Sequence, residues 1–227
     1  MKKTLLFVFA CAAVCIMPLY GQNPESAING HEWVDLGLPS GILWATCNIG
    51  AETPEDYGDF FAWGETTPNK DKYDWSNYKY CKGSDKTLTK YCCKSKLGKM
   101  GSIDNLTLLL PEDDAATTNW GEGWRIPTEE DFEELYNNTT VTWTTQNGVN
   151  GVLLTASNGN SLFLPAAGYR HEIDYEDEKV QGYYWSSSLF TVASYGVYFL
   201  KVDSDGCAVR RIIRSVGCSI RPVASSH

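Results

Sequence analysis

Several features that would assign the sequence directly to an enzyme or membrane class are absent from it. Histidine occurs only three times and no G-x-S-x-G motif is present, so a hydrolase triad is not indicated. No C-x-x-C or histidine-paired cysteine spacing occurs, and the adjacent Cys92 and Cys93 are poor zinc partners. We therefore expect no metal and no cofactor. After residue 21, no apolar run approaches the roughly 18 residues that a membrane-spanning helix needs, so we expect no transmembrane segment.

Basic residues are also in the minority, with 19 Lys and Arg against 28 Asp and Glu and a formal net charge of −9. Binding to nucleic acid or to an anionic membrane depends on concentrated positive charge, so neither partner is expected. No long Pro, Gly or Ser-rich linker and no solenoid or propeller repeat divides the chain. The sequence therefore predicts one folded domain.

The N-terminus is the one strongly apolar part of the chain. Lys2 and Lys3 precede an apolar run that ends near Pro18, and the small residue Gly21 follows. This pattern predicts a secretory signal peptide over residues 1–21, with the mature chain beginning near Gln22 and a short lead over residues 22–32. Cys11 and Cys15 each resemble the cysteine of a weak lipobox, which leaves a lipid anchor open. We expect a protein that is secreted or held at the outer surface of a bacterium, with the periplasm as a further possibility.

Six cysteines follow the signal peptide, and an even number in an exported protein favours disulfides. Six cysteines allow fifteen complete pairings, so the sequence does not fix the connectivity. Because a bridge across a long loop would restrict the unfolded chain most usefully, we take Cys81 with Cys92 as the first candidate pair.

Turn residues and alternating apolar residues predict a mostly antiparallel β-structure with two short helices. A hairpin is expected from Trp33 onward, with its turn at residues 38–41, and a three-stranded meander is expected over residues 140–167. One helix should follow Pro111, and a second should begin after Thr128, which has Asp131 three residues on. The acids of this second helix are interpreted as a solvated face, because they lack the spacing of a calcium loop.

Between the hairpin and the first helix lies a polar stretch rich in aromatic residues, TTPNKDKYDWSNYKYCKGSDKTLTKYCC. Its Asn, Asp, Lys and Ser content predicts a long surface loop, and long ordered loops often carry function.

The run WVDLGLPSGILWATCNIGAETPEDYGDFFAWGET resembles the Fibrobacter succinogenes major paralogous domain, a family frequent in exported proteins of the Bacteroidetes and Fibrobacteres. The resemblance continues through WGEGWRIPT, LFLPAAGYR, GYYWSSS and the terminal SIRPV, and so covers residues 33–227 as a single domain. WRIPTEEDFEEL, YYWSSS and IRPV are also similar to the Legionella collagen-like adhesin C-terminal domain and, more distantly, to the formylglycine-generating sulfatase-modifying fold. These relatives imply an α+β fold of C-type-lectin-like architecture, in which the first and last strands pair and long loops form the ligand face.

The sequence lacks the residues for formylglycine generation and for calcium-dependent sugar binding. The formylglycine-generating proteins use a close cysteine pair near the chain end, whereas ten residues lie between Cys207 and Cys218 here, so that oxidation is not expected. The EPN, QPD and WND tripeptides of calcium-dependent lectins are also absent. We therefore expect a non-catalytic recognition module for a glycan or an extracellular protein, and the alternative is an uncharacterised enzyme acting on envelope or dietary polysaccharide.

If a sugar is bound, exposed aromatic rings would stack on its faces while polar side chains supply directional hydrogen bonds. The polar aromatic stretch and the GYRHEIDYED stretch, which follows a predicted strand, hold the best residues for this role. The expected ligand-binding residues are Tyr73, Trp75, Tyr169, Arg170, His171, Asp174 and Tyr175. Trp44, Trp63, Trp124, Trp143 and Trp185 are instead expected in the core, and no catalytic residue is assigned.

Overall fold

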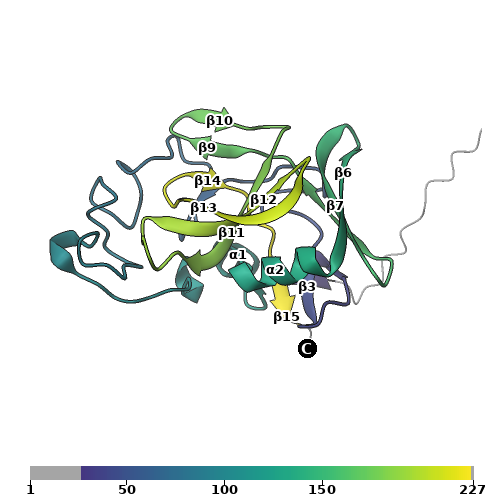
Figure 1. Ribbon diagram of the computed structural model, residues 1–227, viewed down its shortest axis with the longest axis horizontal. Helices are drawn as coiled ribbons and strands as arrows, with labels where there is room; N and C mark the ends of the chain where they lie inside the picture. The colour runs from purple at the N-terminus through teal and green to yellow at the C-terminus, as the bar shows by residue number, and fades with distance from the viewer. Residues whose placement is uncertain (1–26, 226–227) are drawn as a thin grey trace, which may run out of the picture.

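A computed structural model describes residues 27–225 (Figure 1), and the predicted signal peptide lies outside these residues. Within these residues, four antiparallel sheets and two short α-helices make up most of the regular structure, so the expected antiparallel strands with two short helices are confirmed. The helices are α1 (Ala115–Trp120) and α2 (Glu129–Asn137), and the 3-10 turns are η1 (Lys99–Gly101) and η2 (Pro111–Asp113). Within the described residues, no helix has the length and apolar character required to cross a membrane.

The first sheet joins the two ends of the described chain. Its strands, in spatial order, are β1 (Ala27–Ile28), β2 (His31–Asp35), β3 (Ile42–Ala45), β15 (Val223–Ser225) and β5 (Trp124–Arg125). The predicted N-terminal hairpin is present as β2 and β3, and β15 lies between β3 and β5. Because β1 and the start of β2 belong to this sheet, residues 27–32 are part of the folded structure. The sequence had suggested that residues 22–32 form a short segment that precedes the domain.

The remaining strands form three smaller sheets. The four-stranded sheet runs β10 (Asp174–Glu176), β9 (Tyr169–His171), β14 (Gly217–Cys218) and β4 (Phe61–Ala62). One three-stranded sheet runs β11 (Gly182–Leu189), β12 (Gly196–Asp203) and β13 (Gly206–Ile213). The other is the predicted meander of β6 (Thr139–Gln146), β7 (Val149–Ala156) and β8 (Ser161–Pro165).

Helix α2 begins where its sequence predicts. The Thr128 hydroxyl accepts a hydrogen bond from the Asp131 backbone N–H at 3.2 Å, and the Asp131 carboxylate accepts one from the Thr128 N–H at 2.8 Å. This reciprocal capping box satisfies donors that the first helical turn would leave unpaired. Phe132 and Leu135 then bury one side of the helix in the core.

The helix expected after Pro111 is divided in two. Pro111 begins the 3-10 turn η2, and α1 starts only after Asp114, whose carboxylate accepts from the backbone N–H groups of Ala116 and Thr117. The other Asp114 oxygen accepts from the Ile126 N–H at 2.8 Å, so this buried side chain ties α1 to β5.

Two hydrophobic clusters form the core. The larger one lies beneath the four-stranded sheet and residues 66–110, which we call the irregular segment and which form the blue and teal lobe at the left of Figure 1. The smaller one lies between α2, β3, β7, β8 and β12. Four of the five tryptophans assigned to the core are less than 2% exposed, namely Trp44, Trp63, Trp124 and Trp185. Trp143 is only half-buried, at the margin of the smaller cluster.

Candidate functional site

The two segments predicted to form the ligand face lie side by side. The backbone N–H of Tyr73 donates to the Glu172 carbonyl at 2.8 Å, and the Glu172 N–H returns a bond to the Tyr73 carbonyl at 2.9 Å. The Arg170 guanidinium lies 5.6 Å from the centre of the Tyr73 ring and 4.0 Å from the centre of the Tyr175 ring. These contacts join the segments to each other.

Tyr73 cannot serve as a stacking surface for a ligand, because its side chain is completely buried. Its hydroxyl donates to the Phe60 carbonyl at 2.6 Å and accepts from the Lys70 N–H at 3.2 Å. With the polar atom satisfied in this way, burial of the ring is favourable despite its polar sequence neighbours. A Cβ at Gly217 would come within 2.5 Å of the ring, so the neighbouring strand fits closely against it. The expected binding role of Tyr73 is therefore wrong.

The other predicted binding residues differ in exposure. Trp75, Tyr169, Arg170 and His171 are half-buried, whereas Asp174 and Tyr175 on β10 are exposed. The Trp75 ring meets Tyr78 edge to face with centroids 5.7 Å apart, and the Tyr169 ring lies 4.6 Å from that of Tyr183. None of these seven residues lines either of two cavities, of about 600 Å³ and about 570 Å³, that lie elsewhere in the fold.

The predicted Cys81–Cys92 disulfide is also wrong. The Cys81 thiol donates to the Trp75 carbonyl at 3.1 Å, and the Cys92 thiol donates to the Lys94 carbonyl at 3.2 Å. Each sulfur is therefore held in its own backbone environment within the core. The described cysteines are all free thiols: Cys47, Cys81, Cys92, Cys93, Cys207 and Cys218.

A cavity of about 600 Å³ lies between the N-terminal hairpin, the segment that follows it, and the β6–β7–β8 meander. We call it the Trp33 cavity. It is lined by Glu32, Trp33, Val34, Thr46, Cys47, Glu52, Thr53, Pro54, Glu55, Gln146, Asn147, Leu153, Ser161, Leu162 and Phe163. Trp33 is half-buried and Phe163 is buried, so aromatic surface and polar groups meet in one space.

The polar side of the Trp33 cavity is built around a buried carboxylate. Glu55 is 8% exposed and accepts hydrogen bonds from Gln146 Nε2 at 2.5 Å and from Asn147 Nδ2 at 2.8 Å. Asn147 and Gly148 have positive φ angles of 49° and 85°, as a two-residue type I′ hairpin turn requires. The first turn of the meander thus also places an amide on Glu55.

A buried arginine from the C-terminal SIRPV motif supports the wall that carries Glu55. Arg221 Nε donates to Asn48 Oδ1 at 2.8 Å, and its Nη1 donates to the Thr46 carbonyl at 2.6 Å. Asn48 in turn donates to the Tyr57 carbonyl at 3.0 Å. These bonds fix the two ends of the segment between β3 and Tyr57, so the cavity wall is held from within the fold.

The lining of the Trp33 cavity is acidic. Its lining holds the acids Glu32, Glu52 and Glu55 and contains neither lysine nor arginine. Burial raises the pKa of the Cys47 thiol, so the only lining thiol stays protonated and weakly nucleophilic at neutral pH. Within residues 27–225, no group of three or more His, Cys, Asp and Glu side chains is arranged to hold a metal ion.

Comparison with known proteins adds no relative. No family description, curated protein or solved structure matches the chain.

Sequence reasoning missed the cavity residues because they come from distant parts of the chain. Trp33, Glu55 and Asn147 lie on a strand, a connecting segment and a turn, and only the tertiary fold brings them to one space. The glycine-containing turn of the meander indicates in the sequence that Asn147 lies in a turn, but it does not indicate that Glu55 is its hydrogen-bond partner.

Proposed function

We propose that the chain is an exported or cell-surface recognition module that binds a neutral glycan in the Trp33 cavity. The observation that carries this proposal is the buried Glu55 carboxylate, oriented by two amides, in the same cavity as the half-buried Trp33 indole. Carboxylate and amide groups form directional hydrogen bonds with sugar hydroxyls, and the indole supplies an apolar surface for the C–H face of a pyranose.

The charge of the lining narrows the ligand class. The Glu52 and Glu55 carboxylates, in a lining that contains no lysine or arginine, repel uronic acids, sialic acids and sulfated sugars. A neutral glycan meets no such repulsion and uses the carboxylates as hydrogen-bond acceptors. We therefore propose neutral sugars as the ligands of this cavity.

A C-type-lectin-like architecture is proposed on the basis of the resemblance to the Fibrobacter succinogenes major paralogous domain. The position of β15 beside the N-terminal hairpin supports it, since the relatives imply pairing of the first and last strands. Glycan recognition in the Trp33 cavity does not depend on that assignment, because it rests on the cavity's own side chains.

A glycan array, followed by calorimetric titration of the best neutral glycan, tests the proposal. Trp33→Ala should weaken binding by about 1 to 3 kcal/mol, as expected for an aromatic anchor. Trp75→Ala is the matched control, because it removes an equally half-buried indole outside the cavity and should leave affinity unchanged. Thermal melts of both variants establish that they are folded.

Two results would contradict the proposal. If Trp75→Ala or Tyr175→Ala abolished binding and Trp33→Ala did not, the ligand face would lie on the segments that the sequence first indicated. If the wild-type protein released reducing ends from the bound polysaccharide, the protein would be an enzyme and not a recognition module.

A further inference from the structure

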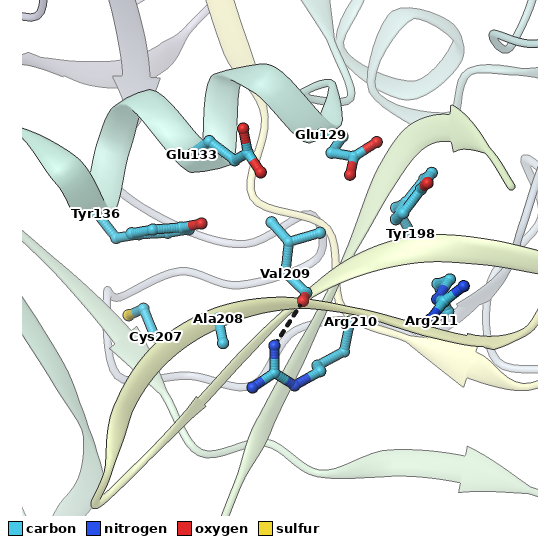
Figure 2. Close-up of a pocket in the computed structure, with 9 residues that line it drawn as sticks. All are labelled: Glu129, Glu133, Tyr136, Tyr198, Cys207, Ala208, Val209, Arg210 and Arg211. Atoms are coloured by element: carbon cyan, nitrogen blue, oxygen red, sulfur yellow. Dashed lines mark hydrogen bonds between the residues drawn. The ribbon is translucent and has the colours of Figure 1, made fainter.

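A second cavity, of about 570 Å³, lies between α2 and β13 (Figure 2). We call it the α2–β13 cavity. It shares no lining residue with the Trp33 cavity and is lined by Glu129, Glu133, Tyr136, Tyr198, Cys207, Ala208, Val209, Arg210 and Arg211. Its chemistry is therefore separate from that of the proposed glycan site.

The helical wall of this cavity follows from the register of α2. Glu129, Glu133 and Tyr136 are spaced at i, i+4 and i+7, which places them along one side of the helix. Figure 2 shows the two carboxylates projecting from α2 toward β13, with the Tyr136 phenol beside them and Tyr198 of β12 across the space. Because Phe132 and Leu135 bury another side of α2, this register is fixed by the core.

The two carboxylates that face the cavity are not held by a close contact, although Arg211 attracts Glu129 from a distance. Within the described residues, neither the Glu129 nor the Glu133 carboxylate makes a hydrogen bond or an ion pair. Burial and the charges of Glu130 and Glu133 raise the pKa of Glu129, and Arg211 only partly opposes this rise. Negative charge thus accumulates on this wall without a neutralising contact.

The two arginines on β13 are engaged elsewhere. Arg210 Nη1 donates to the Val209 carbonyl at 3.0 Å, and Figure 2 shows its guanidinium on the side of the strand away from α2. The Arg211 guanidinium lies over the Phe190 ring, 4.3 Å from its centre. Neither guanidinium makes an ion pair with Glu129 or Glu133, so the carboxylates and the tyrosine rings remain available to a ligand, while Arg211 offsets part of the charge of Glu129 from a distance.

We propose that the α2–β13 cavity binds a primary ammonium group of the kind found in a lysine side chain. An ammonium ion between Glu129 and Glu133 relieves the repulsion between the carboxylates, while the faces of Tyr136 and Tyr198 attract the same cation. An alkyl stem fits against Val209, which lies at the floor of the cavity in Figure 2.

Other ligand classes fit this site less well. Calcium requires six to eight oxygen ligands, and two carboxylates separated by one helical turn do not supply such a shell. An anion would face the unpartnered acids directly. The Cys207 thiol adds no nucleophile, because burial, reinforced by the charge of Asp203, raises its pKa to about 12.

The first test uses the wild-type protein and two small probes. Nα-acetyl-lysine methylamide carries the free ammonium group, and its Nε-acetylated form has the same stem without the charge. In NMR titrations, we expect the charged probe to shift amide resonances of α2 and β13 saturably and to bind at least about tenfold more tightly than the neutral probe. Equal affinity of the two probes, or no saturable shift at these positions, overturns the proposal.

The second test locates the charge that is responsible. The double variant Glu129→Gln with Glu133→Gln keeps the size of both side chains and should weaken binding of the charged probe by about tenfold or more. Glu130→Gln removes an equal charge from the same helical turn but outside the cavity lining, and should change affinity by less than about twofold. An equal loss in the two proteins would indicate general charge attraction and would overturn the site. Should the double variant fail to fold, the two probes on the wild-type protein still decide the question.

Discussion

Residues 66–110 and residues 139–213 reach a folded state by different means. The first segment contains the short turn η1 and no strand, whereas the second contains eight strands, six of which form two three-stranded antiparallel sheets. Both segments bury large aromatic side chains, including Tyr78, Tyr91 and Trp185. The comparison shows that a segment without strands can still be part of the core when turns within it and side chains from elsewhere satisfy its polar groups.

Two charged side chains from outside the first segment contribute to this. Asp113 accepts from the Tyr80 hydroxyl, from the Tyr91 hydroxyl at 2.6 Å and from the Lys90 ammonium at 2.5 Å. Arg214, which is fully buried after β13, donates to the carbonyls of Tyr91 and Lys90, each at 2.9 Å. The irregular segment is thus attached to the rest of the fold partly through buried side chains, in addition to backbone bonds such as those between Tyr73 and Glu172, and an alternating sequence pattern does not record these side-chain contacts.

Removing the carboxylate should therefore have the largest effect on this segment. We expect Asp113→Ala to lower the free energy of unfolding by about 3 to 5 kcal/mol, because it leaves Lys90 and two tyrosine hydroxyls without their buried partner. Urea denaturation measures the change. Glu112→Ala is the control, since its side chain is 64% exposed and its loss should cost no more than about 0.5 kcal/mol.

The stabilising effect of the Asp113 carboxylate should depend on pH. Burial alone would raise the pKa of Asp113, but the hydrogen bonds from Lys90, Tyr80 and Tyr91 hold it below its ordinary value. A lowered folded-state pKa gives stability that is present above the unfolded-state value of 3.8 and is lost as the pH falls below it. The stability gap between wild type and Asp113→Ala should therefore narrow at low pH. A gap that widened would exclude the ionised carboxylate as the stabilising form.

In the meander, we expect a smaller loss from a single aromatic deletion. Trp143 pairs with Val152 across the β6–β7 ladder and is only half-buried, so Trp143→Ala should cost about 1 to 3 kcal/mol, less than a fully buried tryptophan. Thr142→Ala, on the exposed neighbouring position of β6, serves as the control in the same denaturation experiment. A loss as large as that of Asp113→Ala would show that the meander relies on single contacts as much as the irregular segment does.

The limits of sequence reasoning follow from this difference between the segments. The meander, the N-terminal hairpin and α2 could be predicted because turn residues, alternation and the Thr128 capping box are local signals. The interior position of Tyr73 could not be predicted in the same way, because it depends on a carbonyl acceptor at Phe60 and on the space left by Gly217.

The two cavities also differ in how much of each can be predicted from the sequence. The i, i+4, i+7 spacing of Glu129, Glu133 and Tyr136 can be read from the sequence, which shows that these residues share one side of α2. That β13 lies opposite this side and completes a cavity cannot be read from it. The Trp33 cavity joins a hairpin, a connecting segment and the turn of the meander, so no local pattern marks it. Sites on one helix are therefore accessible to sequence analysis, whereas sites between sheets require the fold.

The smallest expected effect concerns Tyr175, at the edge of the contact between the irregular segment and β10. Its side chain is 56% exposed, and its ring meets Arg170 at 4.0 Å and Phe60 edge to face at 5.7 Å. An exposed cation–π contact of this kind contributes about 0.5 to 1 kcal/mol, so Tyr175→Ala should lower stability by no more than that amount. Tyr175→Phe keeps the ring and should be nearly neutral. Denaturation of both variants beside wild type provides the measurement. A loss above about 2 kcal/mol for Tyr175→Ala would mean that Tyr175 anchors the irregular segment as Asp113 does, and that the attachment of this segment extends to its surface.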